Sequence, residues 1–232
     1  MLHTSIKNFL VIALLSSTSA LVSCKKDKAP EPKPAATAPA KTDQPAVAAT
    51  EKTVTVPSEA AGAFPAGKYE LDASHSVFLF KARHFGAGFT YGWFKDVSGS
   101  VVVDPDVTKQ SIELSIKTES IESRDAKRDE HLRSPDFFNA AQFPTITFKS
   151  TKIEAGTAGA LAVTGDLTMH GVTKPVTAQV VPLGTGTDPW KNVRVGYETK
   201  ITIKRSDFEM KFMPDGIGDD IELTIGIEGA KK

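Results

Sequence analysis

Ser111-Ile112-Glu113-Leu114-Ser115-Ile116-Lys117 alternates strictly between polar and apolar residues. Successive side chains of a β-strand point to opposite faces, so Ile112, Leu114 and Ile116 share one face. Thr145-Ile146-Thr147-Phe148-Lys149 repeats the pattern. Both stretches therefore predict strands with one buried and one exposed face.

Strand-like runs fill most of the chain after residue 67. The further runs are 76–82, 98–103, 160–169, 176–181, 193–204 and 221–228. Turn formers separate them, such as Asp104-Pro105-Asp106 and His170-Gly171. Eight or more alternating strands joined by short turns predict an all-β protein, an antiparallel barrel or sandwich.

One stretch departs from this pattern. Residues 123–133 are densely charged and lack β-branched side chains. Ser123 is a candidate N-cap, with Asp125 in the first turn facing the positive end of the helix. We predict a short helical segment around residues 124–140, with the rings of Phe137 and Phe138 pointing into the β domain.

The N-terminus has the features of an export signal. A weakly positive start precedes the apolar run 9–15, and Leu21-Val22-Ser23-Cys24 follows a stretch of small residues. The run is too short to span a bilayer, which takes about 20 apolar residues. Cys24 is the chain's one cysteine, and its setting resembles a bacterial lipobox, in which the thiol is alkylated by diacylglycerol. We predict a lipoprotein signal peptide over residues 1–23 and lipid attachment at Cys24; the alternative is a plain secreted protein with a chance cysteine.

Residues 24–66 are dominated by Pro, Ala, Lys and Thr, with almost no large apolar side chain. Such a segment cannot bury enough surface to offset its chain entropy, so we predict a disordered tether. Residues 67–232 have the size of one domain. Lys25 after the cysteine resembles the outer-membrane sorting default, so we expect an exported protein, lipid-anchored in the cell envelope at the outer membrane and facing the periplasm. Balanced charge, 28 Lys+Arg against 28 Asp+Glu, argues against a nucleic-acid partner.

Several motifs occur together in register over residues 68–228. They are YELDASHS at 69–76, Arg124-Asp125 with His131-Leu132, Phe137-Phe138, Phe143-Pro144, VTGDLTMHGVTKPV at 163–176 and IKRSDF at 203–208. In these the chain resembles the YceI-like family. The resemblance implies a lipocalin-like antiparallel β-barrel of about eight strands, export, a long isoprenoid or similar apolar chain as ligand, and often a homodimer. Glu209 stands where the family usually has Gly after Arg-Ser/Thr-Asp-Phe, so we expect a position that tolerates positive φ to be lost there.

A barrel of about eight strands either fills with its own side chains or holds one small ligand. Small residues on the inward rows, such as Ser76 and Ala82, favour a cavity; the alternative is that the aromatic rings simply form a core. We predict that the cavity is lined by Phe78, Phe80, Ala82, His84, Phe94, Leu114, Ile116, Phe137, Phe138, Ile146 and Phe148. Beyond the bound lipid we expect no cofactor.

The histidines His75, His84, His131 and His170 show no metal-ligand spacing, and no nucleophile or phosphate-loop motif occurs. We therefore predict no metal site and no catalytic residue. Two alternatives remain open: an enzyme with His84 or His75 as acid/base on a lipid or quinone-like substrate, and an envelope stress adaptor that binds protein partners on the outer barrel face.

Overall fold

The computed structural model describes residues 64–232, and the predicted signal peptide, Cys24 and most of the predicted tether lie outside this range. The strands are β1 (Gly67–Leu71), β2 (Val77–His84), β3 (Gly88–Phe94), β4 (Val97–Val103), β5 (Ser111–Lys117), β6 (Ile121–Glu122), β7 (Thr145–Ala155), β8 (Leu161–Met169), β9 (Val172–Thr187), β10 (Val193–Lys204) and β11 (Ile217–Lys231). The α-helix is α1 (Ala126–Arg133), and four 3₁₀ turns are η2 (Val107–Lys109), η3 (Thr118–Ser120), η4 (Thr157–Gly159) and η5 (Arg205–Phe208).

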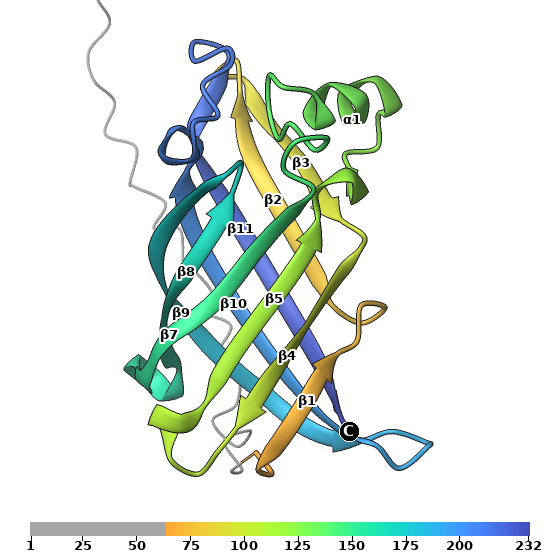
Figure 1. Ribbon diagram of the computed structural model, residues 1–232, viewed down its shortest axis with the longest axis vertical. Coiled ribbons are helices and arrows are strands. Elements are labelled where there is room, and N and C mark those ends of the chain that lie inside the picture. The colour runs from red at the N-terminus through yellow and green to blue at the C-terminus, as the bar shows by residue number, and fades with distance from the viewer. Residues whose placement is uncertain (1–63) are drawn as a thin grey trace, which may run out of the picture. The chain divides into compact units, whose positions relative to one another are not determined.

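Eight of these strands close into a barrel. The hydrogen-bonded order is β1-β4-β5-β7-β8-β9-β10-β11, and β11 pairs again with β1, every pairing being antiparallel. Closure leaves no unpaired sheet edge around this ring. The predicted all-β antiparallel barrel of about eight strands with one short helix is confirmed (Figure 1).

Toward the end of the barrel that carries α1, the strands pair differently from those of the closed ring. The last part of β11 pairs with β1, whereas its first part pairs with β2, and β3 and β6 continue this sheet. The wall between β5 and β7 closes as far as Thr118, whose N–H and Oγ donate to the carbonyls of Pro144 (2.9 Å) and Phe143 (2.7 Å). Beyond it, within residues 64–232, β6 pairs with β3 alone. We call this end of the barrel, which carries α1, the mouth (Figure 1).

The segment between β6 and β7, which includes α1, lies at this mouth (Figure 1). Phe138 packs edge-on against Phe94 of β3, with ring centroids 5.5 Å apart, and Phe137 packs against Phe212 at 5.3 Å. Both rings therefore point toward the barrel, as predicted.

The helix begins later than predicted. Asp125 is the N-cap, and its carboxylate accepts the N–H of Arg128 at 2.9 Å. The prediction of Ser123 as N-cap was wrong, because Arg124 has φ 66° and turns the chain between Ser123 and the helix. Ser123 is instead buried, and its N–H and Oγ donate to the carboxylate of Asp129 at 2.7 and 2.5 Å.

Two apolar clusters fill the barrel unevenly. The larger cluster includes Tyr69, Val101, Val163 and Val195 and lies toward the β1 end. The smaller is Ile146, Met169, Ile203, Phe208 and Met210, toward the mouth. Neither cluster fills the lumen between them, which positions the cavity described below.

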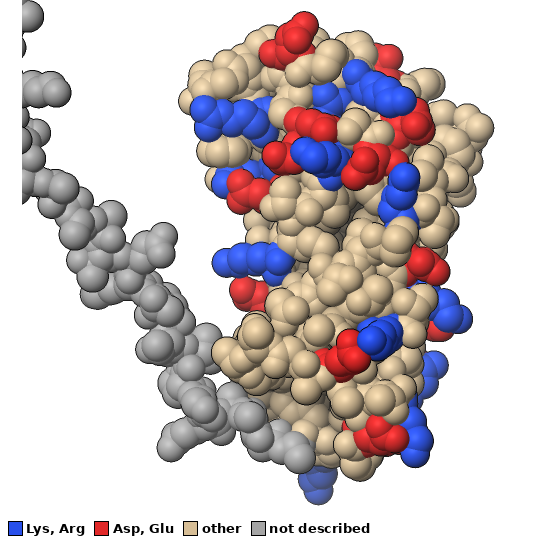
Figure 2. Space-filling view, turned by 90° about the vertical axis from the view of Figure 1, so that its left-hand side faces the viewer, with Lys and Arg blue, Asp and Glu red and all other residues tan. Residues whose placement is uncertain are grey.

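On the outside, Lys and Arg side chains are interspersed with Asp and Glu over the face in Figure 2, in line with a formal net charge of +0. Of the part of the chain that the structure describes, no helix has the length and apolar character needed to cross a bilayer.

Candidate functional site

The barrel encloses an apolar cavity with a volume of ≈ 400 Å³. Its walls come from all around the barrel, from Tyr197 and Ile227 in the larger cluster to Phe137 and Phe212 at the mouth. Between Tyr197 and Ile203 of β10 the lining spans about 20 Å, at about 3.3 Å per residue. Size and lining match those of small-molecule sites, which are typically about 300–1,000 Å³ and mostly apolar.

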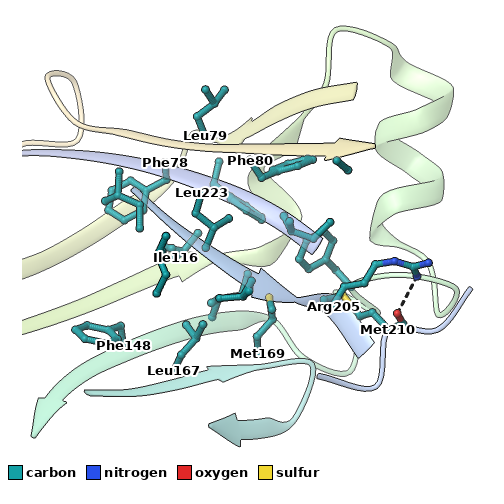
Figure 3. Close-up of a pocket in the computed structure, with 18 of the residues that line it drawn as sticks. Phe78, Leu79, Phe80, Ile116, Phe148, Leu167, Met169, Arg205, Met210 and Leu223 are labelled. Carbon is teal, nitrogen blue, oxygen red and sulfur yellow. Dashed lines mark hydrogen bonds between the residues drawn. The ribbon is translucent and has the colours of Figure 1, made fainter. Parts of the chain in front are cut away.

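All eleven residues predicted to line a cavity lie on its wall, namely Phe78, Phe80, Ala82, His84, Phe94, Leu114, Ile116, Phe137, Phe138, Ile146 and Phe148. Figure 3 shows four of these, Phe78, Phe80, Ile116 and Phe148, directed into the hollow. That they contact a ligand stays a prediction.

The lining also includes residues that sequence reasoning missed. They come mainly from the later strands: Leu167, Met169, Val176, Ala178, Ile201, Ile203 and Leu223, with Met210 from the loop after η5. For most of them, the alternation of polar and apolar residues along 160–169, 193–204 and 221–228 could have predicted an inward-facing position. No sequence pattern predicts a lining position for Met210, because its loop reaches the lumen only through the tertiary fold.

Two glycines keep the aromatic rings against the wall. A Cβ at Gly165 would lie 2.6 Å from Cε2 of Phe148, and one at Gly92 would lie 2.6 Å from Cε1 of Phe80. Ordinary carbon–carbon contacts are about 3.5–4.0 Å, so each ring occupies the space that a side chain on the neighbouring strand would need. The rings therefore lie flat over the sheet, and the centre of the barrel stays open.

Polar groups concentrate at the mouth. Arg205 of η5 is 5% exposed and donates to the carbonyls of Gly218, Met210 and Ile217 at 3.1, 2.8 and 2.9 Å (Figure 3 shows the bond to Met210). Burial lowers the pKa of its guanidinium. The group stays protonated, because arginine side chains are not deprotonated in proteins. This end of the cavity is also lined by Arg128 and His131 of α1 and by Arg83 and His84 at the end of β2.

An aromatic group links α1 to the loop before β11 across the mouth. The imidazole of His131 packs edge-on against the rings of Phe137 (5.0 Å) and Phe212 (5.2 Å). Its Nε2 lies 2.8 Å from the carboxylate of Asp136. His131 was expected to be solvated; it is about half exposed, and its ring also contacts the rings of Phe137 and Phe212.

Known proteins resemble this chain in sequence and in fold. The family model of the YceI-like domain matches residues 69–229. The chain belongs to the YceI-like domain family. A UPF0312 protein of Pseudomonas paraeruginosa is 38% identical over 175 residues, and Protein YceI of Escherichia coli O157:H7 is 37% identical over 175 residues; each alignment covers 74% of this chain and 91% of the relative.

Solved structures share the fold. The Campylobacter jejuni YCEI protein is 31% identical with a TM-score of 0.56, over 61% of this chain and 84% of that one. Burkholderia cenocepacia BcnA, at 24% identity, has a TM-score of 0.62 over 68% of this chain and 98% of its own. A polyisoprenoid binding domain from Saccharophagus degradans is 16% identical, with a TM-score of 0.58 over 72% of this chain and 100% of its own.

At the opposite end of this YceI-like domain, Arg194 joins three acidic residues. Its Nη1 donates to Asp72 (2.6 Å) and Glu228 (2.7 Å), and its Nε donates to Asp188 (3.1 Å). Arg194, followed by hydrogen bonds from Ser74 and His75, holds the pKa of the Asp72 carboxyl well below its usual range. Ligand atoms of Asp72, His75 and Glu228 lie within 4.8 Å of one another, and Nη1 of Arg194 donates to the two carboxylates of this group.

His75 belongs to this cluster, where its Nδ1 lies 2.9 Å from Asp72, the turn-stabilising contact that was expected. It is not among the residues that line the cavity. His170 likewise has a structural contact, since its Nδ1 lies 3.0 Å from the carbonyl oxygen of Phe208.

Glu209 keeps the backbone conformation that its replacement of Gly was expected to remove. It is the C-cap of η5, with φ 61° and ψ 13°. The expectation was wrong because two closing bonds hold the turn regardless of the side chain: the N–H of Glu209 donates to Ser206, and that of Met210 donates to Arg205. The domain therefore places a non-glycine residue in the left-handed region here.

Proposed function

We propose that this protein binds one long apolar chain, an isoprenoid or similar amphiphile such as an isoprenoid quinone, inside its barrel. The observation that carries the proposal is the open, apolar lumen, which the packing of Phe80 and Phe148 over glycines leaves unfilled. The shared fold with a Saccharophagus degradans domain described as polyisoprenoid binding supports the choice of ligand class.

Burial of the chain would supply the affinity. Each buried methylene contributes about 0.8 kcal/mol, so four isoprene units offer more than about 10 kcal/mol before the costs of ordering the ligand. Selectivity along the chain would rest on its length and shape, since the lining around Phe78, Ile116 and Leu167 offers only apolar contacts.

In this proposal the domain is exported and tethered through lipid on Cys24 at the outer membrane, facing the periplasm, and carries or sequesters a lipid that water does not dissolve. The lipobox-like sequence around Cys24 and the Pro-rich residues 24–66 support the tether. A homodimer remains a prediction.

Binding is favoured over the two alternatives. His75 does not line the cavity, and within residues 64–232 the imidazole of His84 forms no hydrogen bond, its close neighbour being the ring of Phe85 (4.8 Å). The typical signature of a catalytic base is a second group that orients it, and among the described residues His84 has none. An adaptor would use the outer face of β3, where Phe89 and Tyr91 are 43% and 49% exposed. Lys81 and Arg83 of β2 lie over the ring of Phe89, so charged side chains interrupt this apolar surface.

The test is native mass spectrometry with organic extraction of the domain purified from its host envelope. We expect a copurified apolar chain with the wild type and with Val77→Phe, an outward position that is 45% exposed. We expect its loss with Ala82→Phe, which places a ring in the lumen from the same strand. An empty wild-type domain that also takes up no added C20 isoprenoid would refute the proposal.

A further inference from the structure

We propose that the mouth of the cavity binds an anionic head group, a phosphate or carboxylate, through Arg128 and Arg205, so that the ligand enters tail first. This rests on the proposed lipid binding and adds the chemistry of the head group. Three arginines line the cavity, whose other residues are mostly apolar. Arg83 donates to the carbonyl of Gly86 and lies over the ring of Phe89. Arg128 and Arg205 come from segments far apart in sequence and are the two that we assign to the head group.

The guanidinium of Arg128 is anchored by hydrogen bonds to Ser123 and still has free N–H donors. Its Nε donates to Oγ of Ser123 at 2.7 Å and its Nη2 donates to the carbonyl of the same residue. A guanidinium carries five N–H groups, and within residues 64–232 those on Nη1 have no hydrogen-bond partner. An anchored arginine with free donors is suited to bidentate recognition of phosphate or carboxylate.

Arg205 supplies a second, buried positive charge. Its three bonds all go to backbone carbonyls, which leaves two N–H groups uncommitted. Asp219 is near enough to interact with the charge of Arg205 but forms no hydrogen bond with it. No carboxylate oxygen of the described chain lies within 4.0 Å of the guanidinium of Arg205 or Arg128. A buried cation with no directly paired carboxylate favours an anionic partner.

The carboxylates near the mouth are engaged with other donors. Asp129 accepts from Ser123, and Asp136 lies against His131. Asp219 accepts the N–H and Oγ of Ser206.

The lining contains one further carboxylate residue, Glu198. Its side chain is 46% exposed, with Lys200 at 3.9 Å. It therefore does not offset the two arginines at the mouth.

The experiment compares three C20 probes that share one chain: geranylgeranyl phosphate, geranylgeranoic acid and geranylgeraniol. Affinities are measured by competition with a fluorescent apolar probe on the wild type, Arg128→Gln, Arg128→Lys and Lys127→Gln. Lys127 is the matched control, an exposed cation on the same helix that does not line the cavity. Geranylgeraniol has no anionic group, so its affinity measures binding of the apolar chain alone. A variant that has misfolded is recognised because it no longer binds geranylgeraniol.

We expect the wild type to bind the phosphate or the acid at least about tenfold more tightly than the alcohol. Arg128→Gln should remove most of this preference and leave alcohol affinity within about threefold, Arg128→Lys should retain part of it, and Lys127→Gln should retain it. The ratio of phosphate to acid affinity identifies which anion is preferred.

Equal wild-type affinities for all three probes would overturn the inference while leaving the proposed function intact. So would an equal loss of preference in Arg128→Gln and Lys127→Gln, which would indicate general electrostatic attraction. Failure of every probe to bind the wild type would refute both proposals.

Discussion

Replacing Gly165 by Ala tests how the barrel stays hollow. The added Cβ would lie 2.6 Å from Cε2 of Phe148 and 2.6 Å from the carbonyl oxygen of Lys149, about 1 Å inside normal contact. Relief of the first contact requires the ring to move about 1 Å into the lumen, and relief of the second requires β8 to shift against β7. Overpacking of this kind typically costs about 1–3 kcal/mol.

Urea unfolding followed by circular dichroism, together with geranylgeraniol affinity, measures both consequences. We expect Gly165→Ala to lower the free energy of unfolding by about 1–3 kcal/mol and to weaken binding. Gly186→Ala is the control, since a Cβ there meets nothing within 4 Å, and it should change neither quantity.

A double-mutant cycle separates the ring from the backbone contact. In the Phe148→Leu background the carbonyl contact remains while the ring contact is gone, so Gly165→Ala should cost less by about 1 kcal/mol. If Gly165→Ala costs the same in both backgrounds, or if it leaves binding unchanged, the ring does not depend on the glycine and the reasoning is refuted.

Two further outcomes follow from the backbone and the charge cluster. Glu209→Gly should raise Tm by about 2–4 °C, because glycine adopts φ 61° without the Cβ penalty; an unchanged or lower Tm in a thermal melt would contradict this. The pKa of the Asp72 carboxyl is lower in the folded state than its unfolded value of about 3.9. The ionised carboxylate therefore stabilises the fold above about pH 3.9, and this stabilisation is lost as the pH falls through the folded-state pKa. Arg194→Gln should therefore lower Tm at pH 7, and the gap to the wild type should narrow below about pH 4; a gap that is constant with pH would contradict the assignment.

Much of the architecture was predictable because local pattern and fold agree. The alternation in 111–117 and 145–149 reappears as β5 and β7, paired with Ile116 opposite Ile146 and Leu114 opposite Phe148. Alternation marks the inward face of a strand whatever its neighbours are. That is why the nine predicted lining positions on β2, β3, β5 and β7 lie on the cavity wall. Phe137 and Phe138 reach it from the segment between β6 and β7 instead.

The helix start shows where local reasoning failed. Ser123 has the right chemistry for an N-cap, but its hydroxyl is taken by Asp129 and Arg128. The choice between Ser123 and Asp125 was made by the left-handed turn at Arg124, which no propensity indicates for that residue.

Period-two patterning alone was enough to establish strands, their buried faces and a barrel-like class, because each property depends on neighbours one or two residues away. Whether the barrel is hollow, and which charges border it, depends on register and closure between distant segments. Gly165 lies beneath Phe148 only because β7 and β8 pair as they do, and Arg128 meets the same lumen as Arg205 only once β11 has closed the ring.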